Sequence, residues 1–254
     1  MGAWLVRVFR TLLPLVVIAL SLLSLCLTLF AGLRRDPYID KNYVFKVDAT
    51  NFAQYQGPRR DAGSTPANSI GLANHYYVYL WNHCESNKKM NFFYCSRPRI
   101  DYYFNSVRLL KARLKRDVLV KIPTGSDSYH KRLQITSYCA LAFLAFGLVL
   151  SFTTFVFVGI ITLAGSGTAF TSALSGISTL VLIIGSGLVS GQYLELKNLI
   201  RDKASYLKVT GEEGSWGLFF LWASSALSLL SFISLLLATR FIRNKREATA
   251  KLYN

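Results

Sequence analysis

The sequence predicts a membrane α-helical protein, in which a bundle of four transmembrane helices carries a small extracellular β-sheet closed by a disulfide. Three observations lead to this fold class: long uncharged blocks, an uneven distribution of basic residues, and one isolated pair of cysteines. The chain has 254 residues, of which 52% are hydrophobic, with 29 basic and 13 acidic side chains. Its mean hydropathy is +0.33.

The uncharged blocks predict the number of spans. They cover residues 11–33, 133–194 and 214–239, which are 23, 62 and 26 residues long. About 20 apolar residues cross a bilayer, so the longest block is sufficient for two crossings. Clustered Gly and Ser favour a tight turn at 164–168. We therefore expect transmembrane helices at 11–33, 133–163, 169–192 and 215–239. The first is expected to be an uncleaved anchor, because the apolar region of a signal peptide is shorter.

Basic residues predict the orientation. The loop 34–132 is too long to follow the positive-inside rule, which leaves seven basic residues on the tails 1–10 and 240–254 against four on the loop 193–214. An even number of spans places both tails on one side, and the cluster "RFIRNKR" behind the last span indicates that this side is cytoplasmic. The turn 164–168 would then be cytoplasmic, and both loops would be extracellular.

The isolated cysteine pair lies in "YLWNHCESNKKMNFFYC", residues 79 to 95. On the extracellular side, Cys84 and Cys95 are expected to be oxidised to a disulfide. The alternative is a zinc site that includes His75 or His83, but the spacing matches no common zinc pattern. The other two cysteines fall inside predicted spans, where they are expected to act as small apolar residues: Cys26 and Cys139.

Aromatic and β-branched residues around the cysteines predict a sheet. "HYYVYLWNHC" and "NFFYC" have the composition of half-buried strands, and the polar "ESNKKMN" between them is typical of a turn. The disulfide would close this hairpin. "NYVFKVDATN" predicts a further strand of the same sheet, whereas "GEEG" at 211–214 is expected to be only a turn before the last span.

Small residues recur at helical spacing in the third span. They are Ser172, Gly176, Gly187 and Gly191. Pairs of small residues four apart let helix backbones approach closely in lipid. Two interpretations stay open: packing inside the four-helix bundle, or contact with another subunit or partner protein.

The segment "SVRLLKARLKRDVLVK", residues 106–121, predicts a basic amphipathic helix. Its apolar side chains are spaced by three and four residues, and basic side chains occupy the other faces, namely Arg108, Lys111, Arg113, Lys115 and Arg116. This face could contact acidic lipid headgroups or glycans, or it could be a solvated face of a helix packed on the hairpin.

The sequence argues against catalysis and transport. The predicted spans contain no Asp, Glu, Lys, Arg or His, on which pumps and ion-coupled carriers usually depend. The Ser, Asp and His of "SDSYH" are too close in sequence to form a triad easily. A lipid-modifying enzyme would need polar catalytic residues at the membrane interface that the sequence does not assemble. We expect no cofactor, no metal, no small-molecule substrate and, given the compartment, no nucleic acid.

Three stretches carry a family resemblance. "LWNHC", which contains Leu80, Trp81 and Asn82, followed by Cys95, resembles the Trp-x-x-Cys…Cys signature of the claudin superfamily. The chain resembles the fungal Sur-seven/PalI family more closely, because "YVFKVDATN" and "CSRPRIDYYFN" are similar to segments of that family. The motifs lie within residues 43–105.

The resemblance implies a claudin-like fold and a plasma-membrane protein of furrow-like microdomains, associated with eisosomes, the cell cortex and cell-wall organisation. It implies no catalysis. The expected partners are membrane lipids and either further copies of the chain or other microdomain membrane proteins. The alternative is a claudin-like auxiliary subunit or sensor for a channel or signalling partner.

Overall fold

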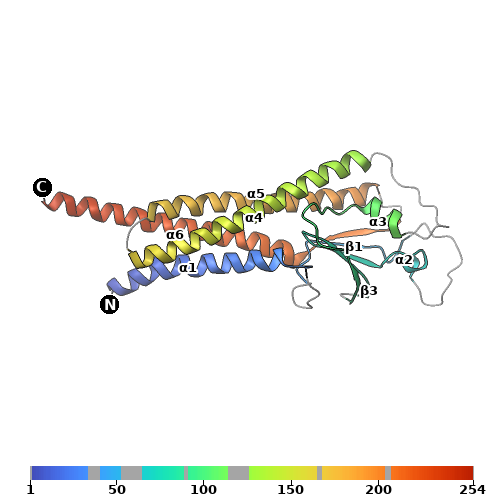
Figure 1. Cartoon of the computed structure of the whole chain (residues 1–254), viewed down its shortest axis with the longest axis horizontal. Coiled ribbons are helices and arrows are strands. Elements are labelled where there is room, and N and C mark those ends of the chain that lie inside the picture. Colours follow the sequence, from blue (N-terminus) through green and yellow to red (C-terminus); the bar gives the residue numbers. More distant parts are fainter. Residues whose placement is uncertain are drawn as a thin grey trace. The chain divides into compact units, whose positions relative to one another are not determined.

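The computed structural model describes residues 2–33, 41–52, 65–88, 91–113, 126–164, 168–203 and 207–253. Helices and strands follow one another along the chain as labelled in Figure 1. The helices are α1 (Gly2–Leu29), α2 (Pro66–Ser69), α3 (Ser106–Arg113), α4 (Ser126–Ala164), α5 (Thr168–Lys203) and α6 (Ser215–Tyr253). The strands are β1 (Phe45–Asp48), β2 (His75–Val78), β3 (His83–Lys88), β4 (Asn91–Cys95) and β5 (Thr210–Glu213).

The chain divides into two compact units. The bundle unit comprises Met1–Cys26, Ala142–Ser186 and Phe220–Asn254. The sheet unit comprises Leu27–Leu141 and Gly187–Phe219. Each unit has its own core of buried side chains.

Within the described residues, four helices are long and apolar enough to cross a membrane, as predicted. Their candidate spans are Leu12–Leu29, His130–Ile160, Ala169–Asp202 and Trp216–Phe241. The helices extend further than the uncharged blocks did. For example, α4 begins at Ser126, α5 continues to Lys203 and α6 to Tyr253. Charge marks where the apolar block ends, whereas the helix continues because backbone hydrogen bonding does not depend on apolar side chains.

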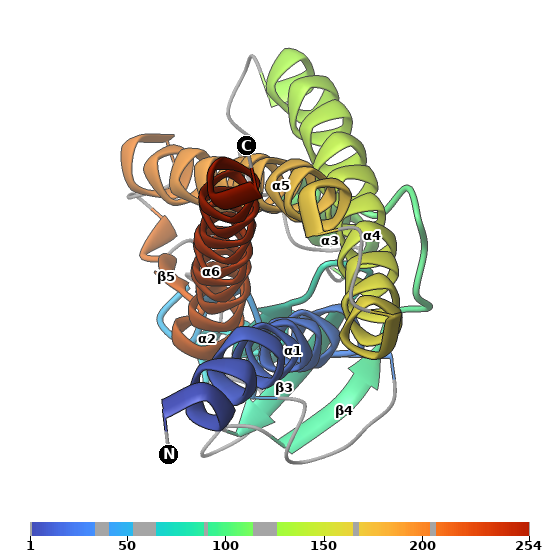
Figure 2. The same ribbon diagram turned by 90° about the vertical axis from the view of Figure 1, so that its left-hand side faces the viewer.

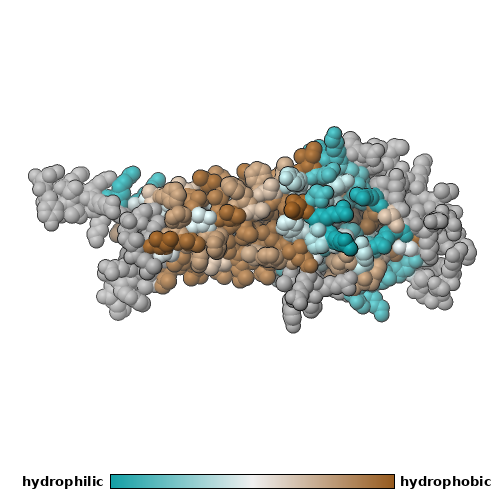
Figure 3. Space-filling model, in the orientation of Figure 1, coloured by the Kyte–Doolittle hydropathy of each residue, from teal (hydrophilic) through white to brown (hydrophobic). Residues whose placement is uncertain are grey.

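The bundle unit is apolar on its outside. Its helices α1, α4, α5 and α6 lie side by side in Figures 1 and 2. Large aliphatic and aromatic side chains on them are exposed, among them Leu20, Leu23, Phe146, Phe152 and Leu180. The face drawn in Figure 3 accordingly shows hydrophobic residues over these helices. A soluble protein rarely exposes so large an apolar surface, so this unit suits a lipid environment.

The interior of the bundle unit combines apolar contacts with hydroxyl groups. Ile18 of α1, Val158 of α4 and Leu235 of α6 form a buried apolar cluster. Buried Ser and Thr side chains occupy much of the remaining interior. The bundle therefore carries apolar side chains both inside and outside, and its interior also holds small hydroxyl groups.

The sheet unit contains an antiparallel sheet with the strand order β4-β3-β2-β1-β5. The further strand predicted in "NYVFKVDATN" is β1, in which Phe45 and Val47 are buried while Lys46 and Asp48 are half-buried. The Phe45 ring stacks on Tyr193 of α5, with ring centroids 5.5 Å apart. This contact anchors the sheet to a helix of the same unit.

Two predicted turns are strands in the structure. The polar segment Glu85–Lys88 belongs to β3, which pairs with β2 on one side and β4 on the other. "HYYVYLWNHC" is consequently divided into two strands by a turn, which the hydrogen bond from Tyr79 N to Asn82 O closes. The polar composition of β3 concealed it, because pairing on both sides stabilises a strand regardless of its own propensity.

The second incorrect turn is "GEEG". Its first three residues belong to β5, which pairs along β1 with Phe45 opposite Glu213. Gly211 lets the strand approach closely, since a Cβ there would lie 2.7 Å from the Phe45 ring. Lys46 and Glu212 add an ion pair of 3.0 Å. This strand depends on a partner more than 160 positions away, which local composition does not reveal.

Candidate functional site

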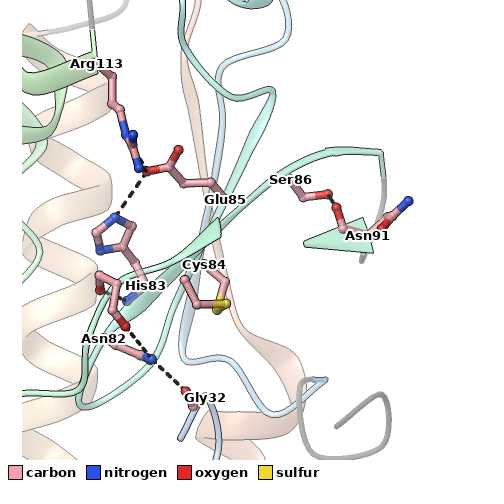
Figure 4. The surroundings of a disulfide bond; sticks show 10 residues. Gly32, Asn82, His83, Cys84, Glu85, Ser86, Asn91 and Arg113 are labelled. Atoms are coloured by element: carbon pink, nitrogen blue, oxygen red, sulfur yellow. Dashed lines mark hydrogen bonds and ion pairs between the residues drawn. A yellow bond between two sulfur atoms is a disulfide. The ribbon is translucent and has the colours of Figure 1, made fainter. Parts of the chain in front are cut away.

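The predicted disulfide between Cys84 and Cys95 is confirmed, with an S–S distance of 2.07 Å. The two residues are directly opposite each other in the ladder between β3 and β4. Cys84 is buried in a cluster with Ala31, Tyr77 and Tyr79. The partly buried Phe92 and Cys95 pack against this cluster. The bond thus fastens the open end of the hairpin to the aromatic core of the sheet unit (Figure 4).

The Leu80–Asn82 motif attaches the end of α1 to the sheet. The indole N–H of Trp81 donates to the carbonyl of Leu29 at 2.5 Å. The amide of Asn82 donates to the carbonyls of Gly32 at 2.6 Å and Ser96 at 3.2 Å (Figure 4). Leu80 is buried. The Trp81 hydrogen bond therefore caps the Leu29 carbonyl, which the end of α1 would otherwise leave unpaired.

Gly32 is the partner that makes this junction tight. Its φ is +76°, a left-handed conformation that favours glycine. An added Cβ would lie 2.5 Å from the Asn82 Oδ1 and 2.6 Å from the Tyr79 ring. The chain after α1 can therefore approach the motif only with glycine at this position.

A buried ion pair, which sequence reasoning missed, lies next to the disulfide. Glu85 is 2% exposed, and its Oε1 accepts from Arg113 Nε at 3.0 Å and lies 2.9 Å from Arg113 Nη2. The guanidinium also lies over the Tyr94 ring, 4.2 Å from its centroid. His83 Nε2 is 3.6 Å from the same carboxylate oxygen. A single Glu within a polar strand gave no signal that it would be buried and paired with a helix.

The basic helix is described only in part. Arg108 is exposed on α3, whereas Arg113 bonds internally to Glu85. The side chain of Lys111 is not described, and Lys115 and Arg116 lie outside the described residues together with the rest of the predicted amphipathic segment. The lipid or glycan contact of these residues stays a prediction, and Arg113 has in addition a structural partner.

Two charged pairs support β1. Asp48 accepts from the Thr50 backbone N–H at 2.9 Å and lies 3.4 Å from His75 Nδ1. Burial alone would raise the pKa of the Asp48 carboxyl, but the Thr50 hydrogen bond, His75 and Lys46 outweigh it and hold this pKa below its ordinary value. For Lys46, burial acts to lower the pKa, and the hydrogen bond and charge of Glu212 overcome it, so that the pKa is raised.

Hydroxyl pairs connect the helices of the bundle unit. Ser21 of α1 donates to the Ser224 carbonyl at 2.9 Å, and Ser24 donates to the Phe220 carbonyl at 2.8 Å. The other hydroxyl pairs link α4 to α5 and α5 to α6, at 2.7 to 3.0 Å: Ser151 with Ser178, Thr179 with Ser228, and Ser186 with Ser225. In lipid, hydrogen bonds of this kind contribute about 0.6 kcal/mol each.

The small residues of α5 divide into two groups. Ser172 is buried, and a Cβ on Gly176 would lie 2.9 Å from the Phe232 ring of α6. Gly187 and Gly191 are exposed, and a Cβ at either would meet no atom within 4 Å in the part of the chain that the structure describes. These two glycines therefore show no packing contact among the described residues, and their packing in the bundle and their contact with another subunit or a partner both stay predictions.

Two further close contacts involve glycines that sequence spacing did not indicate. A Cβ on Gly185 of α5 would lie 2.9 Å from Leu144 of α4. A Cβ on Gly147 of α4 would lie 2.6 Å from Leu182 of α5.

The described residues include no group of three or more His, Cys, Asp or Glu side chains that could hold a metal.

These features define the class of the protein: a four-span membrane protein of claudin-like fold, with a small antiparallel sheet closed by a disulfide. The model of the SUR7/PalI family matches residues 10–234, and the chain belongs to this family. A fission yeast relative, SUR7 family protein pun1 of Schizosaccharomyces pombe, is 27% identical over 128 residues. This match covers 48% of the chain and 44% of the relative, so the chain is aligned with less than half of that protein.

Proposed function

We propose that the chain is a non-enzymatic protein of the plasma membrane that organises cortical microdomains of the eisosome or furrow type and is linked to cell-wall or cortex organisation. The observation that carries the proposal is the family match across residues 10–234, which includes the first three candidate spans, the disulfide-closed sheet and most of the fourth span. The proposed role is that of a scaffold, in which the spans sit in lipid and the sheet unit presents a fixed surface.

The proposed orientation has both tails in the cytoplasm and the sheet unit outside the cell. Two features support it. The end of the chain after the last span is basic, with "RFIRNKR" at residues 240–246. The Cys84–Cys95 disulfide suits an oxidising compartment.

The proposed partners are membrane lipids and either further copies of the chain or other microdomain proteins. The exposed Arg108 on α3 supports a contact with acidic lipid headgroups or glycans. The exposed Gly187 and Gly191 of α5 support a contact with another membrane helix, because small residues let a second backbone approach.

The same glycine face supports a second candidate function, that of an auxiliary subunit or sensor for a channel or signalling partner. The two functions differ in what the face contacts. Recovery of a specific channel or receptor in mild detergent would favour the second, whereas recovery of the chain itself would favour the first.

Live imaging tests the proposed function. A copy tagged after Asn254 should form stationary patches that coincide with a marker of plasma-membrane furrows. A four-span protein from outside the family, with the same tag, serves as the control and should be evenly distributed. An even distribution of the tagged chain, or patches that never coincide with the marker, would contradict the proposal.

A further inference from the structure

A cleft of about 700 Å³ opens in the sheet unit. Its walls come from β3 and β4, the segment 96–105, α3 and the start of α4. Four arginines line it: Arg97, Arg99, Arg108 and Arg113. The acidic side chains that line it are Glu85 and Asp101, and Glu85 is already bound to Arg113. The cleft is therefore positively charged.

Three of the arginines have no ion-pair partner among the described residues. Arg97, Arg99 and Arg108 are exposed, and no carboxylate within the described ranges lies at ion-pair distance from their guanidinium groups. By contrast, Arg113 is held in place by Glu85 and Tyr94. Guanidinium groups bind phosphate through paired N–H bonds, so a cleft with several unpaired ones suits a phosphate group.

Two polar side chains at the inner wall make no hydrogen bond to the residues that the structure describes. The ring nitrogens of His83 and the Tyr102 hydroxyl are buried without one, and the nearest charged group to His83 is the Glu85 carboxylate, 3.6 Å from Nε2. Burial raises the pKa of the Tyr102 phenol, so its hydroxyl keeps a proton to donate. Buried polar groups are usually hydrogen-bonded, which makes these two side chains candidates for ligand contacts.

The first turns of a candidate membrane span line part of the cleft. Gln134 of α4 lines it, and Ser137 of α4 donates to the Tyr102 carbonyl at 2.7 Å. Both α4 residues are within the candidate span His130–Ile160. The cleft segment therefore runs beside the first turns of a span, which is the depth of the lipid headgroups.

Exposed apolar side chains lie close in sequence to residues that line the cleft. Ile100, between Arg99 and Asp101, is 68% exposed. On α4, Ile135 and Tyr138 are also exposed. Arginine beside exposed aliphatic and aromatic side chains is typical of a protein surface at the membrane interface, where the charge meets headgroups and the apolar groups meet acyl chains.

We propose that this cleft binds the phosphate of an anionic lipid headgroup in the outer leaflet, with Arg97 and Arg99 as the principal contacts. The first turns of a candidate span line part of the cleft, and the exposed Ile135 and Tyr138 on those turns favour a lipid over a soluble glycan or an acidic peptide. The inference deepens the proposed lipid contact and rests on it, but not on the proposed clustering.

Lipid retention by the purified full-length protein tests the proposal. The protein is transferred into nanodiscs of phosphatidylcholine with increasing phosphatidylinositol or phosphatidylserine, and retained lipid is counted by native mass spectrometry. The wild type should retain anionic lipid in preference to phosphatidylcholine. R97Q/R99Q should weaken this retention at least about tenfold, and R97K/R99K should fall between the two, because charge is kept while paired bonding is lost.

The matched control is R201Q, since Arg201 is an exposed arginine of the sheet unit whose ion pair is with the adjacent Asp202. It should retain lipid like the wild type, and thermal unfolding should show all variants folded. Equal retention by R97Q/R99Q and wild type would overturn the proposal. So would displacement of the lipid by inorganic phosphate, an acidic peptide or a glycan at equal concentration. Because this readout needs no clustering, its failure is distinguishable from failure of the imaging experiment.

Discussion

At the scale of single residues, Glu85 is a buried charged residue of the sheet unit that is held by one ion-pair partner. Its carboxylate is 2% exposed in the middle of β3 and depends on the guanidinium of Arg113, whose side chain is 35% exposed. A buried charge that loses its partner is costly, whereas the replacement of both partners by apolar groups is often tolerated. The two residues should therefore be strongly coupled in stability.

Replacement of Arg113 with Met should lower the free energy of unfolding by about 2–3 kcal/mol, below the full range for buried pairs because Arg113 is partly exposed. Glu85→Leu should be milder, because the freed arginine can reach solvent. The double variant should be more stable than the sum of the two single changes predicts. Thermal unfolding in detergent measures the cycle, and additive effects would contradict the coupling.

Asp48 should make the sheet unit sensitive to acid. Its folded pKa lies below its ordinary value, so the charged carboxylate stabilises the folded state above about pH 4, and this stabilisation is lost as the pH falls further. Asp48→Asn should lower stability at pH 7 and flatten its dependence between about pH 5 and 3. Asp101→Asn serves as the control, since Asp101 is exposed. Limited proteolysis across this range provides the measurement, and an unchanged slope for Asp48→Asn would count against the account.

At the scale of elements, residue composition predicted the spans but missed two strands of the sheet, the interior strand β3 and the edge strand β5. The uncharged blocks give four helices because a lipid-exposed segment must be apolar along its length. The local composition of strands β3 and β5 gives no comparable signal. They form because β2, β4 and β1 offer backbone partners, and pairing between distant segments is not encoded in local composition.

The same limit applies to the small residues of α5. Spacing puts Gly176, Gly187 and Gly191 on one side of the helix, but only Gly176 meets a neighbouring side chain. Whether a neighbour lies opposite a glycine depends on where the other helices run, which spacing along one helix does not state. For the same reason, Gly185 contacts Leu144 although no repeat singles it out.

Two neighbouring glycines of α5 should therefore respond differently to Leu. Gly185→Leu should destabilise the bundle unit by about 1–3 kcal/mol, since the new side chain overlaps Leu144. Gly187→Leu should leave the thermal stability of the monomer unchanged and should reduce only contacts with other chains. Unfolding temperature and cross-linking in membranes separate the two effects. Equal destabilisation by both changes would show that a neighbour covers Gly187.

At the scale of the whole molecule, the sequence was sufficient to predict the class of protein and one disulfide bond. Four spans and the Cys84–Cys95 disulfide could be predicted because lipid and redox compartment constrain residue type directly. The Glu85–Arg113 pair and the hydroxyl pairs of the bundle could not. Ser, Glu and Arg occur in many surroundings, and only the fold decides which of them become buried together.

Loss of the disulfide should unfold only part of the molecule. Closure of a loop between residues 11 positions apart contributes about 3 kcal/mol in the chain-entropy picture. This is enough to open one hairpin of the sheet unit, whereas the bundle unit has its own apolar core and hydroxyl pairs. Cys84→Ser is therefore expected to insert into the membrane and to retain four spans while its hairpin becomes sensitive to protease.

Thiol labelling on intact cells tests most directly the central claim, that the sheet unit is a disulfide-closed module outside the plasma membrane. The background is a Cys26→Ala/Cys139→Ala protein, which leaves only the two cysteines of the sheet. A membrane-impermeant maleimide should label this protein only after reduction, and should label Cys95 without reduction once Cys84→Ser is added. Labelling of both cysteines without reductant would contradict the bond, and labelling of Cys84→Ser only after the cells are permeabilised would contradict the orientation.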